Sequence, residues 1–174
     1  MVSARETAAS VLDPELPAVT IAELGILRDV READGAVTVT ITPTYSGCPA
    51  MAQIAADLRR RLAEAGYARV DVRTELSPAW TTDWITPEGR RKLAEAGIAP
   101  PTARPKTVTG PVDCAIDTTR AGPLRNRQAQ PAPVPCPRCG SADTRELSHF
   151  SGTACKALRQ CQACREPFEH VKEH

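Results

Sequence analysis

Two CxxC pairs near the C-terminus constrain this chain more than any other feature of its sequence. Each pair can present two thiolates from a tight turn, so two pairs together can complete the tetrahedral shell of one ion. The 21 residues between the pairs leave room for a β-hairpin. The predicted metal ligands are Cys136, Cys139, Cys161 and Cys164.

The segment that carries these cysteines, residues 134–174, is too poor in apolar side chains to fold without a metal. Inside it we expect a hairpin of strands 145–150 and 156–160. Zinc is the first choice for the ion, and an iron–sulfur centre is the alternative, because four thiolates suit both. A redox CxxC is disfavoured, since no βαβ pattern surrounds either pair. The apolar core candidates are Leu147, Phe150, Leu158, Phe168 and Val171.

The other thiols and imidazoles of the C-terminal half have no firm ligand role. Cys155 is a fifth nearby thiol, for which simple burial and a part in metal exchange both stay open. The four cysteines already complete a shell, so we expect His149, His170 and His174 to be solvated. Cys114 is assigned no role.

Composition limits the cellular compartment and the classes of partner that we expect for this chain. The chain has 7 cysteines, an odd number, which fits metal ligands and free thiols better than disulfides. It shows neither an apolar leader nor a run of about 18 apolar residues, so we expect a cytoplasmic protein with no membrane segment. A formal net charge of +1 gives no electrostatic reason to expect nucleic acid as a partner.

The first hundred residues alternate between helical and strand patterns. Helices are predicted at residues 4–12, 49–65 and 87–96, and strands at residues 25–31, 36–42 and 69–76. Asp34-Gly35 predicts the turn of a hairpin, and Thr86 with Pro87 predicts the start of the last helix. The fold class is therefore α/β (α+β): a small three-stranded sheet with helices in domain 1–100, a proline-rich linker at 101–133, and a four-cysteine ribbon-like domain at 134–174.

Two stretches of the first domain suggest a contact surface. The strand 36–42 alternates three buried-type residues with Thr38, Thr40 and Thr42, so its threonine face is expected to be wet or covered by a partner. The irregular segment 80–85 is partly apolar, and its two tryptophans are expected as core or interface anchors. Both features point to self-association, such as a homodimer, or to another subunit.

Cys48 is the candidate functional thiol of the first domain. It is predicted at the N-cap of the helix that Pro49 opens, where free N–H groups and the helix dipole lower a thiol pKa. Thr44 and Ser46 place hydroxyls in the same loop. A buried cysteine that only caps the helix remains an open alternative.

The motifs together resemble known families. The segments 11–17 and 41–51, with Leu24-Gly25 between them, are similar to the small α/β domain of iron–sulfur assembly factors of the SufT type. The segment 78–85 and the cysteine-rich ending resemble the PaaD family, the accessory proteins of the phenylacetyl-CoA epoxidase (phenylacetate-CoA oxygenase, PaaJ).

This resemblance implies a maturation role and not oxygen chemistry. Cys48 and the Asp13-Pro14-Glu15 motif match signature positions of the family, and with Thr44 they are expected to handle a cluster or a transient iron. The implied partners are epoxidase components, the iron–sulfur reductase or the di-iron oxygenase. On residue chemistry alone, Asp13 and Glu15 would be ordinary caps or a polar edge.

Two other classes of function have less support in the sequence. A nucleic-acid-binding zinc ribbon, or an interaction module, is the alternative, but residues 134–174 hold six Lys or Arg against five Asp or Glu, too small an excess for a phosphate footprint. An enzyme that uses Cys48 lacks an adjacent histidine as base. We therefore expect a non-catalytic accessory protein.

Overall fold

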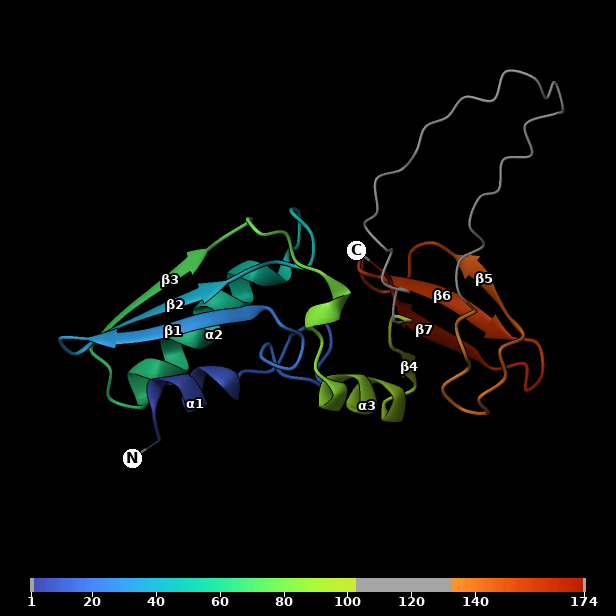
Figure 1. The fold of residues 1–174 in the computed structure, drawn as a ribbon, viewed down its shortest axis with the longest axis horizontal. Helices are drawn as coiled ribbons and strands as arrows, with labels where there is room; N and C mark the ends of the chain where they lie inside the picture. The colour runs from blue at the N-terminus through green and yellow to red at the C-terminus, as the bar shows by residue number, and fades with distance from the viewer. Residues whose placement is uncertain (1, 103–132, 174) are drawn as a thin grey trace, which may run out of the picture.

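The computed structural model describes residues 2–102 and 133–173, and it confirms the mixed α/β class (Figure 1). The helices are α1 (Ala4–Ala9), α2 (Ala50–Glu64) and α3 (Pro87–Glu95), with a 3-10 helix η1 (Thr82–Trp84). The strands are β1 (Leu27–Ala33), β2 (Ala36–Ile41), β3 (Arg69–Thr74), β4 (Ile98–Ala99), β5 (Thr144–Ser148), β6 (Lys156–Cys161) and β7 (Pro167–Val171). None of the helices in these two ranges has the length and apolar character that crossing a bilayer requires.

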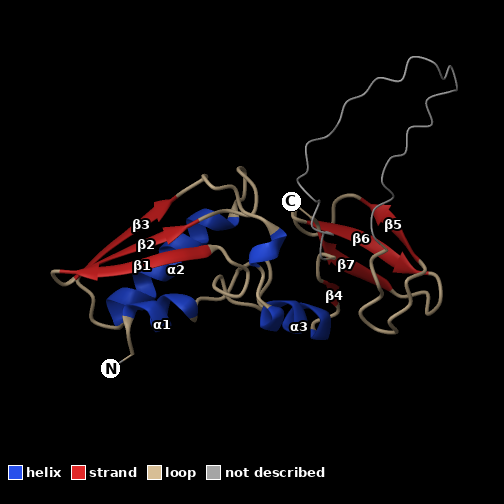
Figure 2. Ribbon diagram, viewed as in Figure 1, coloured by secondary structure: helices blue, strands red, loops and turns tan. Residues whose placement is uncertain are grey.

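The three-stranded sheet of the first part has the order β1-β2-β3, with β1 antiparallel and β3 parallel to β2 (Figure 2). Strand β2 buries Val37, Val39 and Ile41 completely, as its alternation predicts. They join one core with Ile54 and Leu58 of α2, which packs with α1 on the sheet. The threonine face is less wet than predicted, because Thr42 is 3% exposed and its N–H donates to Ile26 O at 2.8 Å.

The local turn signals are confirmed, with one boundary corrected. Asp34 and Gly35 have φ values of 51° and 68°, the left-handed pair that a tight hairpin needs. Helix α1 starts in a capping box between Ser3 and Glu6 but ends at Ala9, three residues before the predicted end. The chain leaves the helix there because residues 11–13 pair with residues 19–21.

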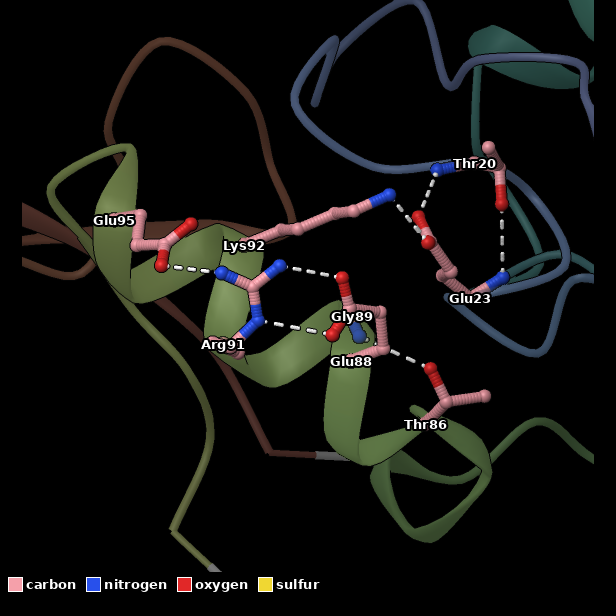
Figure 3. Close-up of polar contacts among 8 residues, drawn as sticks. All are labelled: Thr20, Glu23, Thr86, Glu88, Gly89, Arg91, Lys92 and Glu95. Atoms are coloured by element: carbon pink, nitrogen blue, oxygen red, sulfur yellow. Dashed lines mark hydrogen bonds and ion pairs between the residues drawn. The ribbon is translucent and has the colours of Figure 1, made fainter.

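Helix α3 starts as predicted and is fixed to the loop before β1 (Figure 3). Thr86 caps it by accepting from Gly89 N at 3.0 Å, and Lys92 Nζ reaches Glu23 Oε1 at 2.6 Å. The Glu23 carboxylate also accepts from Thr20 N at 2.8 Å. A side chain at Gly89 would lie 2.8 Å from Glu23 O, so only glycine permits this approach. The helix therefore holds a fixed position, from which the chain enters β4.

The second sheet has the order β4-β7-β6-β5, and it joins the two parts of the chain. Strand β4 pairs in parallel with β7, which places Ala99 opposite His170. Neither β4 nor β7 was predicted, whereas the hairpin of β5 and β6 was. Val171 is buried in the core of the first sheet, so the ribbon is packed against that part. Residues 103–132, which include Cys114 and most of the predicted linker 101–133, lie outside the described residues.

Three expectations about ribbon side chains are wrong. Leu147 and Phe150 are 45% and 61% exposed, since Leu147 lies on β5 at the edge of the sheet and Phe150 lies in the loop after this strand. His170, predicted to be solvated, is 7% exposed, because it lies on an inner strand. Phe168 and Val171 are buried as predicted.

Candidate functional site

The four predicted thiols meet in the ribbon. The sulfur atoms of Cys136, Cys139, Cys161 and Cys164 all lie within 4.8 Å of one another, and among the described residues no other set of three or more such ligands is this tight. The Sγ atoms of Cys139 and Cys161 are 3.5 Å apart, and those of Cys136 and Cys164 are 3.8 Å apart. Each CxxC pair therefore contributes to both close contacts, as the corners of one tetrahedron require.

Backbone N–H groups act on the sulfur atoms of Cys161 and Cys164. Gly140 N donates to Cys136 O at 2.9 Å and closes the first turn, and Cys164 N donates to Cys161 Sγ at 3.4 Å in the second. The Cys164 N–H lowers the pKa of Cys161 to about 7. The N–H of Glu166 also lowers the pKa of Cys164, but burial and the neighbouring thiols outweigh it and raise that pKa to about 12. Only a cation allows all four to ionise together, so the set fits a metal.

The cluster is half sheltered. Cys136 and Cys161 are buried in a small apolar core with Ala99, Val134 and Phe168, whereas Cys139 and Cys164 are exposed. Ala99 comes from β4, so one wall of the site is made by a residue that precedes the linker. Four protein thiols leave no open coordination position, which is typical of a structural site and not of a catalytic one.

Cys48 lies one residue before the position predicted for it. Pro49 is the N-cap of α2, and Cys48 precedes it. The predicted pKa direction is wrong as well. Burial raises the pKa of the Cys48 thiol, the N–H groups of Ala50 and Met51 offset this only in part, and the charge of Glu15 raises it further. A partly buried thiol beside a carboxylate keeps its proton until a cation replaces it.

Asp13 is buried, and its carboxylate accepts hydrogen bonds within its own turn. Its Oδ1 accepts from Glu15 N at 2.9 Å and from Leu16 N at 2.8 Å, and the residue is 4% exposed. Burial raises its pKa despite these two hydrogen bonds. Asp13 therefore shapes the turn that presents Glu15, and Glu15 is the carboxylate of this motif that is turned toward thiols.

Cys155 meets this carboxylate from the other sheet. Its Sγ is 3.7 Å from Glu15 Oε2 and 3.1 Å from Thr153 Oγ1, and it is 6% exposed. Burial raises its pKa, and the Glu15 charge adds to this. Sequence reasoning placed Cys155 only beside the four cysteines. No local signal connects it with a residue 140 positions away.

The loop before Cys48 borders an open pocket. The pocket has a volume of about 360 Å³ and is lined by Thr42, Pro43, Thr44, Tyr45, Ser46, Leu76, Ala79 and Trp80. Thr44 thus faces this pocket. Leu76 is 60% exposed at its rim, but Trp80 and Ile85 are buried, so the segment 80–85 offers less contact surface than predicted. Trp80 acts as a core anchor, donating from Nε1 to Leu24 O at 2.9 Å.

Comparisons with known proteins match both parts of the chain. The PaaD zinc beta ribbon domain matches residues 120–172, and a domain described as "Iron-sulfur cluster assembly protein" matches residues 5–73. A protein of Escherichia coli K12, named as a subunit of a "Putative 1,2-phenylacetyl-CoA epoxidase", is 40% identical over 160 residues, which are 92% of this chain and 85% of that protein.

Shorter relatives match about half of the chain. A protein of Porphyromonas gingivalis named "Fe-S protein maturation auxiliary factor" is 36% identical over 48% of this chain and 81% of its own length. The crystal structure of a domain of unknown function from Bacillus anthracis covers 52% of this chain and 87% of that one, at 27% identity and a TM-score of 0.49.

Proposed function

This chain belongs to the PaaD family, and on that premise we propose that it is a non-catalytic maturation factor of the phenylacetyl-CoA epoxidase system. It assists iron–sulfur cluster or metal-centre assembly in aerobic phenylacetate catabolism. Two kinds of relative support the proposal: a protein named as an epoxidase subunit matches nearly the whole chain, and one named as an Fe-S maturation factor matches about half of it.

One observation carries the proposal: the turn that Asp13 shapes brings the Glu15 carboxylate close to two thiols. Glu15 Oε2 is 3.7 Å from Cys155 Sγ, and the charge of Glu15 raises the pKa of Cys48. Thiolates are soft ligands that bind iron and iron–sulfur units, and a carboxylate can complete their shell. Cys48 is half-buried, so a client can still approach it. These groups suit the transient holding of iron. The proposal places the protein in the cytoplasm, where thiols stay reduced.

The ribbon takes a structural role in this proposal. Cys136, Cys139, Cys161 and Cys164 bind a metal ion, and zinc is the ion we propose, since a closed set of four thiolates is its usual structural site. Metal analysis of anaerobically purified protein should find one zinc per chain. An absorption spectrum with iron–sulfur bands and bound iron in its place would overturn this assignment.

The partner we propose is the reductase or the di-iron oxygenase of the epoxidase. Cells that lack this protein are complemented with the wild type, with Cys48→Ala, or with Ser46→Ala as the matched control from the same loop. Cys48→Ala removes little volume, so the fold should persist while phenylacetate-dependent growth and the metal content of the two clients fall. Full growth with normally loaded clients would return Cys48 to a buried residue beside a helix start.

A further inference from the structure

Cys155 occupies a position that the ribbon's own fold does not require. It is not one of the four clustered thiols, and its Sγ donates to Glu15 Oε2 at 3.7 Å, a hydrogen bond between the two parts of the chain. Thr153 Oγ1, at 3.1 Å, is its second neighbour. The carboxylate keeps the thiol protonated, because their charges would repel if the thiol ionised alone, and a cation that binds between them would remove this repulsion.

Several independent contacts hold Cys155 at this place. Lys172 N donates to Cys155 O at 2.9 Å, which fixes its backbone to the strand end of β7. Val171, the residue before Lys172, is buried in the core of the first sheet. Lys156, the residue after Cys155, pairs with Glu169 Oε2 at 2.7 Å. The position of this thiol opposite Glu15 is therefore set by the docking of the ribbon.

Cys48 belongs to the same neighbourhood. The phenol of Tyr45 is close enough to Cys48, Glu15 and Cys155 that the charges of all three raise its pKa, after burial itself. Tyr45 O also accepts from Cys48 N at 3.2 Å. Two thiols and one carboxylate, drawn from three separate segments, thus lie near one side chain.

We propose that Cys155 is the second thiolate of the iron-handling site, which binds one ferrous ion or the edge of an iron–sulfur cluster through Cys48, Cys155 and Glu15. This rests on the proposed function and extends it from the first part of the chain to the ribbon. Two thiolates and a carboxylate fill three positions and leave one for a client's ligand.

The looseness of the group suits a carrier. Among residues 2–102 and 133–173, only the four ribbon cysteines lie within 4.8 Å of one another, so Cys48 must move toward the other two ligands when iron enters. Residues 43–48 carry no helix or strand and can supply this movement. A site that closes on its ion and opens again releases it more readily than a rigid shell.

The test uses the full chain with zinc in the ribbon, titrated under argon with Co²⁺ as an optical probe for ferrous iron. Four thiolates retain zinc, so added Co²⁺ reports on the second site, and zinc content is measured after each titration. The wild type should bind one Co²⁺ with a thiolate-to-cobalt charge-transfer band. Cys155→Ser should weaken binding by more than the roughly 10- to 100-fold that loss of an outer-shell partner costs, and should reduce the band per bound ion.

Companion variants separate the possible results. Cys48→Ser should behave as Cys155→Ser does, and Glu15→Gln should weaken binding while keeping the thiolate band. Thr153→Ala removes the hydroxyl beside Cys155 but keeps the thiol, so its band should persist. If Cys155→Ser loses zinc, Cys155→Ala takes its place as the apolar replacement.

Wild-type affinity and band in the Cys155 variants, together with loss of both in Cys48→Ser, would overturn the role of Cys155 and leave the proposed function intact. A wild type that shows no thiolate-to-cobalt charge-transfer band would overturn both the shared site and the iron-handling role of Cys48.

Discussion

Lys156 and Glu169 form a 2.7 Å ion pair across β6 and β7, and the Lys156 side chain is only 8% exposed. The Glu169 carboxylate also accepts from Ser151 Oγ at 2.5 Å, so it ties the loop before Cys155 to the sheet. A buried ammonium has lost its hydration, so it needs a paired carboxylate to offset the free-energy cost of that loss. The pair therefore stabilises the segment that presents Cys155.

Removing this carboxylate should destabilise the ribbon. Glu169→Gln leaves Lys156 without its counter-charge, and we expect a loss of about 2 to 3 kcal/mol in the free energy of unfolding. Glu146→Gln is the matched control: its pairing with Arg159 Nη1 is longer, at 3.4 Å, and more exposed, so the loss should stay below about 1 kcal/mol. Urea unfolding of the zinc-loaded chain measures both, and equal losses would contradict the buried-pair argument.

His170 should make stability depend on pH. Burial lowers its pKa to about 4 from the ordinary 6.5, and the charge of Arg159 acts in the same direction. At pH values between these two, His170 is protonated in the unfolded chain and neutral in the folded chain. Stability from this residue is thus complete above pH 6.5 and falls as the pH drops toward 4, by up to about 3 kcal/mol.

The measurement for His170 is the difference between wild type and His170→Gln, unfolded by urea at several pH values. Protonation of the cysteines affects both proteins, so it cancels in the difference. The wild type should lose stability more steeply than the variant between pH 6.5 and 4. Parallel curves would show that His170 takes up its proton over the same pH range in the folded and the unfolded chain.

Gly25 is fixed by both its backbone and its neighbour. It has a φ of 72°, and an added Cβ would lie 2.5 Å from Trp84 Cβ. Gly25→Ala should cost about 3 kcal/mol or more, because left-handed strain and overpacking add. Gly35→Ala, with a φ of 68° and no atom within 4 Å, carries the strain alone and should cost about 1 to 2 kcal/mol. Thermal unfolding of the two variants compares them directly, and equal shifts would exclude the Trp84 contact as the cause.

Local signals predicted the helices and strands of the first sheet and the hairpin of β5 and β6. The apolar face of α2, the Asp34-Gly35 turn and the Thr86 cap each depend on residues within about one helical turn or hairpin, so a single sequence reveals them. The metal site of the ribbon's four cysteines could also be predicted, because the spacing of two CxxC pairs is itself typical of a metal site.

Contacts between segments that are distant in the sequence could not be predicted from it. Strand β4 has two residues, and its partner β7 lies about 70 positions further along, so no periodicity reveals the pairing. The same holds for Cys155 and Glu15. The pKa of Cys48 was predicted in the wrong direction because burial and the carboxylate of Glu15 come from outside its helix. Local helix-start effects act on this thiol, but the tertiary surroundings outweigh them.

Removal of the ribbon metal should expose Cys155 and separate it from Glu15. The ribbon core holds few apolar residues, so without its ion the turns around Cys136 and Cys161 lose the cross-link that orders them. Strand β6 begins directly after Cys155 and ends at Cys161, so disorder at the metal site reaches this thiol along one strand. Cys48 belongs to the first part of the chain and should be affected much less.

Alkylation by iodoacetamide, followed by peptide mass spectrometry, measures this coupling. In the metal-loaded chain Cys155, at 6% exposure, should react slowly and half-buried Cys48 faster. A chelator, or the Cys161→Ser variant, should raise the Cys155 rate at least about tenfold, since lowering the free energy of opening by about 1.4 kcal/mol changes the open population by that factor. The Cys48 rate is the internal control. An unchanged Cys155 rate in metal-free protein would show that the docking of β7 on β4 and on the first core, and not the metal, holds this thiol in place.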